Sequence, residues 1–315
     1  MIQLTTTPSP SATPDSAPPI CDYEGSGYAT DFWQGKGRDY EDAVERIALR
    51  KLLPKTGRRA AEFGAGFGRL TGELAGFDQV VLVDYSRSLL QQAQAHWGRD
   101  SRFVYVVSDV NRLPFAANAF DGATLVRVIH HSPAPLTTLT SIRATLSPAA
   151  VFVLEFANKR NVKAIARYLL RRQTWNPFDK AAIEFVRLNF DFHPAAMRGW
   201  LREAGFGTGR TLAVSMLRLN ALKRRLPASA LVGIDRLIQP SGAVLPLSPS
   251  VFIRCQPLPQ PNAVFASQTV VPFEQLFVNP KRPSSTLSRD SDWLVCPDTG
   301  ERWPIEDGIY NFKSE

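Results

Sequence analysis

Short apolar runs alternate with segments of helical spacing between residues 39 and 256. A short continuous apolar run is typical of a buried strand, whereas apolar residues recurring every three or four positions predict a helix. The predicted strands cover 60–63, 80–83, 103–107, 120–128, 149–156, 211–219 and 250–255, and the main predicted helices cover 39–52, 86–97 and 135–146. This alternation predicts an α/β domain, in which helices cover a sheet.

Two segments are longer than a simple connection requires. Residues 158–194 follow the fifth predicted strand and contain a predicted helix at 161–172. About 30 residues from 221 onward separate the last two predicted strands, with helical spacing at Leu231, Ile234 and Leu237. Long connections without secondary structure are uncommon in compact domains. We therefore expect two helical insertions over one end of the sheet.

The two ends of the chain differ from its middle. Residues 1–22 are rich in Thr, Ser and Pro and are expected to form a disordered tail, because such a composition buries too little apolar surface to offset chain entropy. Residues 257–290 are expected to form a linker, and residues 291–315 a small separate segment. The linker is expected to dock partly through Val270, Phe273, Leu276 and Phe277.

Length and composition allow one large domain and one small addition, since 44% of the 315 residues are hydrophobic. The three cysteines are far apart and odd in number, which argues against a disulfide framework and favours a reducing, cytoplasmic compartment. No apolar run approaches the length of a membrane span.

The most informative motif lies between residues 58 and 74, where glycines occupy positions 64, 66 and 68. Glycines at this spacing let the backbone turn sharply and let a ligand approach main-chain atoms that a Cβ would block. Asp84 ends the next apolar run, where a carboxylate would meet a ribose diol. Dinucleotides and S-adenosylmethionine are both bound in this way. The dinucleotide fingerprint, however, requires a small residue where this chain has Arg69.

With Glu62 leading, the glycines form E-x-G-x-G-x-G, which resembles motif I of class I S-adenosylmethionine-dependent methyltransferases. Asp84, Asp109, LPF at 113–115, FD at 120–121 and HH at 130–131 follow in order. Their arrangement is similar to the small-molecule and lipid methyltransferases that include the quinone-biosynthesis enzymes, over about residues 23–256. The resemblance implies a Rossmann-like, seven-stranded, mostly parallel sheet with helices on both faces and helical insertions over the substrate side.

The same resemblance implies methyl transfer from S-adenosylmethionine to an O, N or C nucleophile of a small-molecule or lipid-like acceptor, without a metal. The cofactor-binding candidates are Glu62, Gly64, Ala65, Gly66, Gly68, Asp84, Tyr85, Asp109, Val110 and Arg127, and Tyr28, Trp33 and Arg38 are candidates for lining the pocket. His131 and His193 are the candidate catalytic residues, because an imidazole titrates near neutrality. A structural or capping role for His131 and a turn role for His193 are the alternatives.

The last segment contains CP-x-x-G at Cys296 and W-P-I-x-D-G-I at 303–309. It resembles a truncated version of the zinc-ribbon-like activator subunit of RNA and protein methyltransferases. Thr299 stands where a second cysteine would be, and a zinc ribbon needs four thiolate or imidazole ligands, so we expect no metal. The segment would instead pack on the main domain through Trp293, Leu294, Trp303, Ile305 and Ile309.

Charge is unevenly distributed. Residues 158–225 hold 15 Lys and Arg against 4 Asp and Glu, so the remaining residues hold 22 against 25. On a helix at 161–172, Lys163, Arg167 and Arg171 fall on one line, which suggests an anionic acceptor or peripheral contact of residues 159–172 with an anionic membrane. A solvated face is the alternative, and RNA is a weaker one because no RNA-binding module is recognisable. Two further functions remain as alternatives: an RNA or protein methyltransferase, and a non-catalytic partner protein that binds S-adenosylmethionine.

Overall fold

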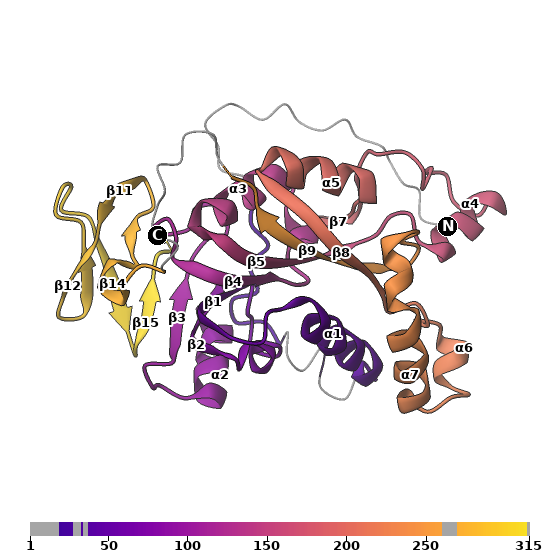
Figure 1. Cartoon of the computed structure of the whole chain (residues 1–315), viewed down its shortest axis with the longest axis horizontal. Coiled ribbons are helices and arrows are strands. Elements are labelled where there is room, and N and C mark those ends of the chain that lie inside the picture. Colours follow the sequence, from indigo (N-terminus) through magenta and orange to yellow (C-terminus); the bar gives the residue numbers. More distant parts are fainter. Residues whose placement is uncertain (1–18, 28–32, 34–36, 260–269, 314–315) are drawn as a thin grey trace.

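The computed structural model describes residues 19–27, 33, 37–259 and 270–313, and its centre is an eleven-stranded sheet (Figure 1). Seven of the strands form the expected Rossmann-like core: in spatial order, β3 (Phe103–Val107), β2 (Phe77–Asp84), β1 (Gly57–Phe63), β4 (Phe120–Leu125), β5 (Leu146–Ala157), β9 (Ser250–Pro257) and β8 (Phe206–Val214). Among these seven, only β9 points in the direction opposite to the other six. The prediction of a seven-stranded, mostly parallel core is confirmed.

Helices cover both faces of this sheet because successive strand residues point to opposite sides. In β2, Val81 and Val83 enter one hydrophobic core while Val80 and Leu82 enter the other. The first core packs against α3 (Pro135–Thr145) and α5 (Pro194–Glu203), and the second against α1 (Asp39–Leu52) and α2 (Arg87–Trp97). Figure 1 shows α3 and α5 on one side of the sheet and α1 and α2 on the other.

Two strands differ from the sequence expectation, and the glycine turn is followed by a single 3-10 turn, η2 (Thr71–Leu74). β4 ends at Leu125 instead of residue 128, because Arg127 has a left-handed φ of +59° and cannot continue the strand. β8 begins directly after Gly205, whose φ of +83° ends α5, so the strand lies about five residues earlier than expected.

Both insertions are helical, as predicted, and project at the same end of the molecule in Figure 1. The first comprises α4 (Val162–Leu169) and the hairpin of β6 (Ile183–Val186) and β7 (Asn189–Asp191). The second comprises α6 (Asn220–Lys223), α7 (Ala228–Ile238) and the 3-10 turn η4 (Gln239–Ala243). It does not stay at the end of the sheet. The hydroxyl of Tyr40 on α1 donates to Asp235 on α7 at 2.6 Å, which holds α7 along the face covered by α1.

Residues 270–313, the C-terminal unit, extend the sheet beyond β3. The unit begins with the 3-10 turn η5 (Phe273–Gln275) and contains β10 (Val278–Asn279), β11 (Arg282–Thr286), β12 (Ser288–Asp290), β13 (Trp293–Val295), β14 (Arg302–Glu306) and β15 (Ile309–Asn311). β15 pairs in parallel with β3, and β14, β13 and β12 follow outward. The expected linker is therefore strand-forming from Val278 onward. Leu294, Ile305 and Ile309 are buried as expected, whereas Trp293 is exposed.

Candidate active site

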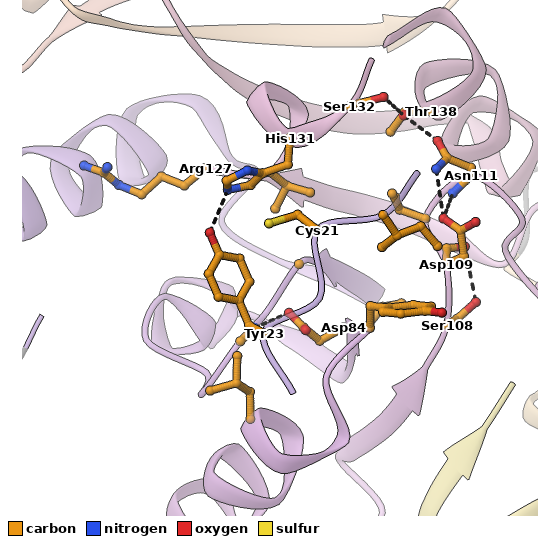
Figure 2. Close-up of a pocket in the computed structure, with 18 of the residues that line it drawn as sticks. Cys21, Tyr23, Asp84, Ser108, Asp109, Asn111, Arg127, His131, Ser132 and Thr138 are labelled. Atoms are coloured by element: carbon orange, nitrogen blue, oxygen red, sulfur yellow. Dashed lines mark hydrogen bonds between the residues drawn. The ribbon is translucent and has the colours of Figure 1, made fainter. Parts of the chain in front are cut away.

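A cavity opens at the carboxyl ends of β1 to β4, the edge of an α/β sheet where ligands bind. It holds about 900 Å³ of empty space, including the part open to solvent. Residues 19–27, the N-terminal strap, close one side of it through Cys21 and Tyr23 (Figure 2). The predicted residues on its lining are Gly64, Gly66, Asp84, Tyr85, Asp109, Val110, Arg127 and His131.

A second, smaller cavity adjoins the glycine turn on its other side. Its lining includes Glu62, Ala65, Trp33 and Arg127, together with Gly64 and Gly66, which face both cavities. Of the other predicted residues, Gly68 lines a surface depression behind the turn, and Tyr28 lies outside the described residues. The guanidinium of Arg38 lies 5.7 Å from the ring centre of Trp33.

The three glycines of the turn serve different purposes, although all have positive φ. A Cβ on Gly64 would lie 2.0 Å from a methyl of Val128, and one on Gly68 would lie 2.7 Å from the indole nitrogen of Trp97. At Gly66 no atom beyond the neighbouring residues lies within 4 Å of such a Cβ, so the space beside its Cα is open to a ligand. This cradle fits a cofactor that approaches the main chain closely.

Asp84 and Asp109 present carboxylates along the wall of the main cavity. Asp84 accepts from the amides of Gly66 at 2.7 Å and Ser86 at 2.9 Å, and burial raises its pKa. Asp109 accepts from the amide and the side chain of Asn111 at 2.8 and 2.9 Å, and burial also raises its pKa. Partly buried acceptors at the ends of adjacent strands suit the hydroxyls and the amino group of an adenosine.

Buried charge surrounds the second cavity. Arg127 binds the fully buried Glu45 of α1 through its guanidinium and donates its amide to Glu155 at 2.8 Å. Arg69 donates to the other oxygen of Glu45 at 2.7 Å and stacks on Trp33, with 3.6 Å from Cζ to the ring centre. Glu62 accepts from Thr71, and burial raises its pKa to about 7. Sequence reasoning missed Glu45, although an acid on the apolar face of a predicted helix is a usable signal.

His131 faces the strap. Its Nδ1 lies 2.8 Å from the carbonyl oxygen of Leu188, and its Nε2 lies 3.2 Å from the hydroxyl of Tyr23 (Figure 2). Because a carbonyl only accepts, Nδ1 carries the proton and Nε2 accepts from Tyr23. Burial lowers the pKa of His131, which keeps the imidazole neutral. Tyr23 was missed because it borders the segment expected to be disordered.

His193 lies on neither cavity lining. It precedes Pro194 and caps α5, since its Nδ1 accepts from the amide of Ala195 at 3.1 Å. Its position agrees with the alternative of a turn residue. Over the described ranges, no group of three or more His, Cys, Asp or Glu side chains could hold a metal ion.

Comparisons with known proteins agree with this geometry. Residues 61–154 match the model of a methyltransferase domain. Demethylmenaquinone methyltransferase of Clavibacter sepedonicus is 24% identical over 64% of this chain and 82% of its own length. Ubiquinone biosynthesis O-methyltransferase of Coxiella burnetii is 23% identical over 67% of this chain and 91% of its own.

Two solved structures share the fold. A chain from the complex between the Haloferax volcanii Trm112 methyltransferase activator and a methyltransferase has a TM-score of 0.53 at 16% identity, covering 74% of this chain and 96% of its own. An S-adenosylmethionine-dependent methyltransferase from Mesorhizobium loti has a TM-score of 0.50 at 18% identity, covering 69% and 99%. The solved structures show the fold. The matched methyltransferase model and the two sequence relatives, together with the open cradle at Gly66 and the acids beside it, support a class I S-adenosylmethionine-dependent methyltransferase domain in this chain, with S-adenosylmethionine as its cofactor.

Proposed function

We propose that this protein methylates an oxygen nucleophile of a small, lipid-like acceptor. The observation that carries the proposal is the pair formed by Tyr23 and His131 on the wall of the cofactor cavity. A hydroxyl acceptor loses a proton as it is methylated, and a neutral imidazole with its Nε2 turned toward the cavity can take that proton. Nitrogen and carbon nucleophiles stay as alternatives for the same site.

S-adenosylmethionine supplies the electrophilic methyl group. As the acceptor oxygen forms its new bond to carbon, its proton passes to the Tyr23 oxygen, and the Tyr23 proton passes to Nε2 of His131. The positive charge released by methyl transfer would end on His131, whose Nδ1–H would stay bonded to the carbonyl of Leu188. The chain otherwise contributes positioning and exclusion of water.

Turnover by purified protein tests this proposal. Fractions of cell extract containing lipids, small molecules, RNA or protein are each offered with S-adenosylmethionine, and S-adenosylhomocysteine is measured. We expect turnover in the lipid or small-molecule fraction, with kcat lowered about 100-fold or more in Tyr23→Phe and His131→Gln. His96→Gln, an exposed histidine on α2, is the control. Full activity of both variants would exclude the proton relay, and turnover only with RNA or protein would exclude a lipid-like acceptor.

The acceptor class is supported by the surface of the insertions. Val162, Leu169, Leu170 and Val186 of the first are exposed, as are Leu237 and Val244 of the second. Lys163, Arg171 and Arg172 are interspersed with them and are also exposed. Apolar side chains among cations suit the interface of an anionic membrane. The two quinone-pathway relatives support such an acceptor by their names alone. Within the described residues no helix is long and apolar enough to cross a membrane.

Vesicle sedimentation tests this recruitment. We expect binding to anionic but not to neutral vesicles, weakened about 100-fold in Lys163→Ala/Arg167→Ala/Arg171→Ala, because each cation near the surface contributes about 1 kcal/mol. Lys55→Ala/Arg99→Ala/Lys281→Ala removes the same charge elsewhere and should bind like the wild type. If both triple variants bind alike, the insertions form only a solvated surface.

A further inference from the structure

The C-terminal unit reaches the cofactor edge of the sheet. In the parallel pairing of β15 with β3, Asn311 lies beside Val107, and the amide of Phe312 donates to the carbonyl of Val107 at 2.8 Å. β3 leads directly to Ser108 and Asp109 on the cavity wall. Because parallel strands end at the same edge of a sheet, residue 313 emerges beside the cavity.

Lys313 joins two parts of the cavity wall that are distant in sequence. Its Nζ lies 2.7 Å from Oδ2 of Asp22, which stands between the lining residues Cys21 and Tyr23. The same ammonium lies 4.2 Å from the ring centre of Tyr85, the lining residue next to Asp84. The Lys313 and Asp22 side chains are 27% and 37% exposed, so the pair is partly shielded from water.

The strap and the C-terminal unit also meet at the first turn of α2. The carboxylate of Glu24 accepts from the amides of Arg87 at 2.6 Å and Ser88 at 3.1 Å, which are otherwise unpaired at a helix start. The Arg87 guanidinium binds Glu306 at 3.2 Å, on the C-terminal unit. One residue of α2 is thus held by the strap through its backbone and by the C-terminal unit through its side chain.

We propose that Lys313 is a positioning residue that holds the N-terminal strap closed over the cofactor cavity. The C-terminal unit then acts as a clamp within the same chain. The β15–β3 pairing fixes the place of Lys313, and its ammonium forms an ion pair with Asp22 and a cation–π contact with Tyr85. The clamp retains the cofactor and sets Tyr23 against His131. It depends on the cofactor site and not on the identity of the acceptor.

Cys21 provides a probe of strap opening, since it lines the cavity and is partly exposed whereas Cys255 and Cys296 are buried. Alkylation of Cys21 by iodoacetamide is followed by mass spectrometry, with and without S-adenosylhomocysteine, and the affinity of that ligand is measured by calorimetry. In Lys313→Ala we expect Cys21 to react about two- to tenfold faster, and S-adenosylhomocysteine to bind about two- to tenfold more weakly. Lys313→Arg, which keeps the cation, should restore both values.

Asp22→Ala should reproduce the effect, and the double variant Asp22→Ala/Lys313→Ala should add nothing to it. The matched control is Lys281→Ala, which removes an exposed lysine of the same unit that pairs with Glu301 at 2.7 Å. It should leave Cys21 reactivity and ligand affinity unchanged. The clamp would be overturned if Lys313→Ala kept the wild-type Cys21 reactivity and ligand affinity. It would also be overturned if Lys281→Ala changed both values as much as Lys313→Ala does. Neither measurement uses an acceptor, so a wrong acceptor class leaves this test intact.

Discussion

The insertions and the C-terminal unit are both additions to a seven-stranded sheet, yet large apolar side chains are buried in the C-terminal unit and exposed on the insertions. In the C-terminal unit Leu276 and Ile309 are fully buried, and Phe277 is 4% exposed. In the insertions Leu237 is 79% exposed and Leu169 is 70% exposed. One addition has become part of the core, while the other presents an apolar surface to its surroundings.

This difference separates two uses of added chain. The ring centres of Tyr310 and Phe312 lie 4.6 and 5.6 Å from that of Phe277. All three residues join the core that also contains Phe115 and Phe120. Such burial stabilises the protein whatever the protein binds. Apolar side chains that stay exposed instead suit contact with a partner, as we propose for the insertions. We therefore infer that the C-terminal unit supports the fold and that the insertions meet a partner.

Phe277→Ala should give the largest effect and tests the comparison directly. Removing a buried aromatic ring costs about 3–5 kcal/mol of unfolding free energy, because the cavity that remains is only partly refilled. Leu237→Ala, on the exposed face of α7, should stay within about 0.5 kcal/mol. Urea denaturation of both variants measures the difference. Similar losses of unfolding free energy in the two variants would contradict the inference that the C-terminal unit supports the fold and the insertions do not.

The cofactor edge of the sheet differs from the insertions in charge as well, because its acidic groups Glu45, Glu62 and Glu155 are buried whereas most cations of the insertions are exposed. Burial of acids makes the stability of the protein depend on pH. Burial raises the pKa of Glu62 to about 7 from an ordinary value of 4.5, so the folded protein holds more protons than the unfolded chain between those values. Stability should therefore fall as pH rises from about 4.5 to about 7 and level off above, by about 3 kcal/mol for this group.

Glu62→Gln isolates this contribution, because other groups titrate alike in both proteins. The difference in unfolding free energy between variant and wild type, measured from pH 4.5 to 8, should grow across the window. A difference independent of pH would mean that Glu62 keeps an ordinary pKa in the folded protein.

Asp84→Ala should have a smaller effect on stability and a specific effect on binding. A hydrogen bond to a charged group contributes about 1.5–3 kcal/mol, so the affinity for S-adenosylhomocysteine should fall about 10- to 150-fold. Calorimetry measures it, and Asp78→Ala, at the exposed start of the same strand, is the control. Unchanged affinity in Asp84→Ala would show that Asp84 does not bind the ribose of the cofactor.

Local patterns predicted the centre of the molecule well. The helix at 39–52 and the strand at 103–107 have the predicted bounds, and Ser86, at the start of the helix predicted at 86–97, caps α2 by accepting from the amide of Leu89. These elements follow from side chains a few positions apart, which one sequence displays directly. The same reasoning found the glycine turn and the acids that end β2 and β3, which line the cavities.

Contacts between distant segments were not predictable. Tyr23 pairs with His131 across 108 residues, and no periodicity links them. The pairing of β15 with β3 was hidden because each strand is short, and because the residues before β15 look like a linker. Glu45 and Arg127 form a buried ion pair that only the meeting of α1 with the end of β4 creates. The sequence identifies individual residues of such a site but not which of them are in contact.

The Asp22–Lys313 contact spans 291 residues and has a consequence for how the protein matures. During synthesis the N-terminal strap leaves the ribosome long before residue 313 exists, so Lys313 cannot hold the strap while the sheet assembles beneath it. Because the pairing of β15 with β3 places Lys313, this contact should form only after β15 has paired with β3. The strap would be held fully closed over the cofactor cavity only when translation has passed the C-terminal unit.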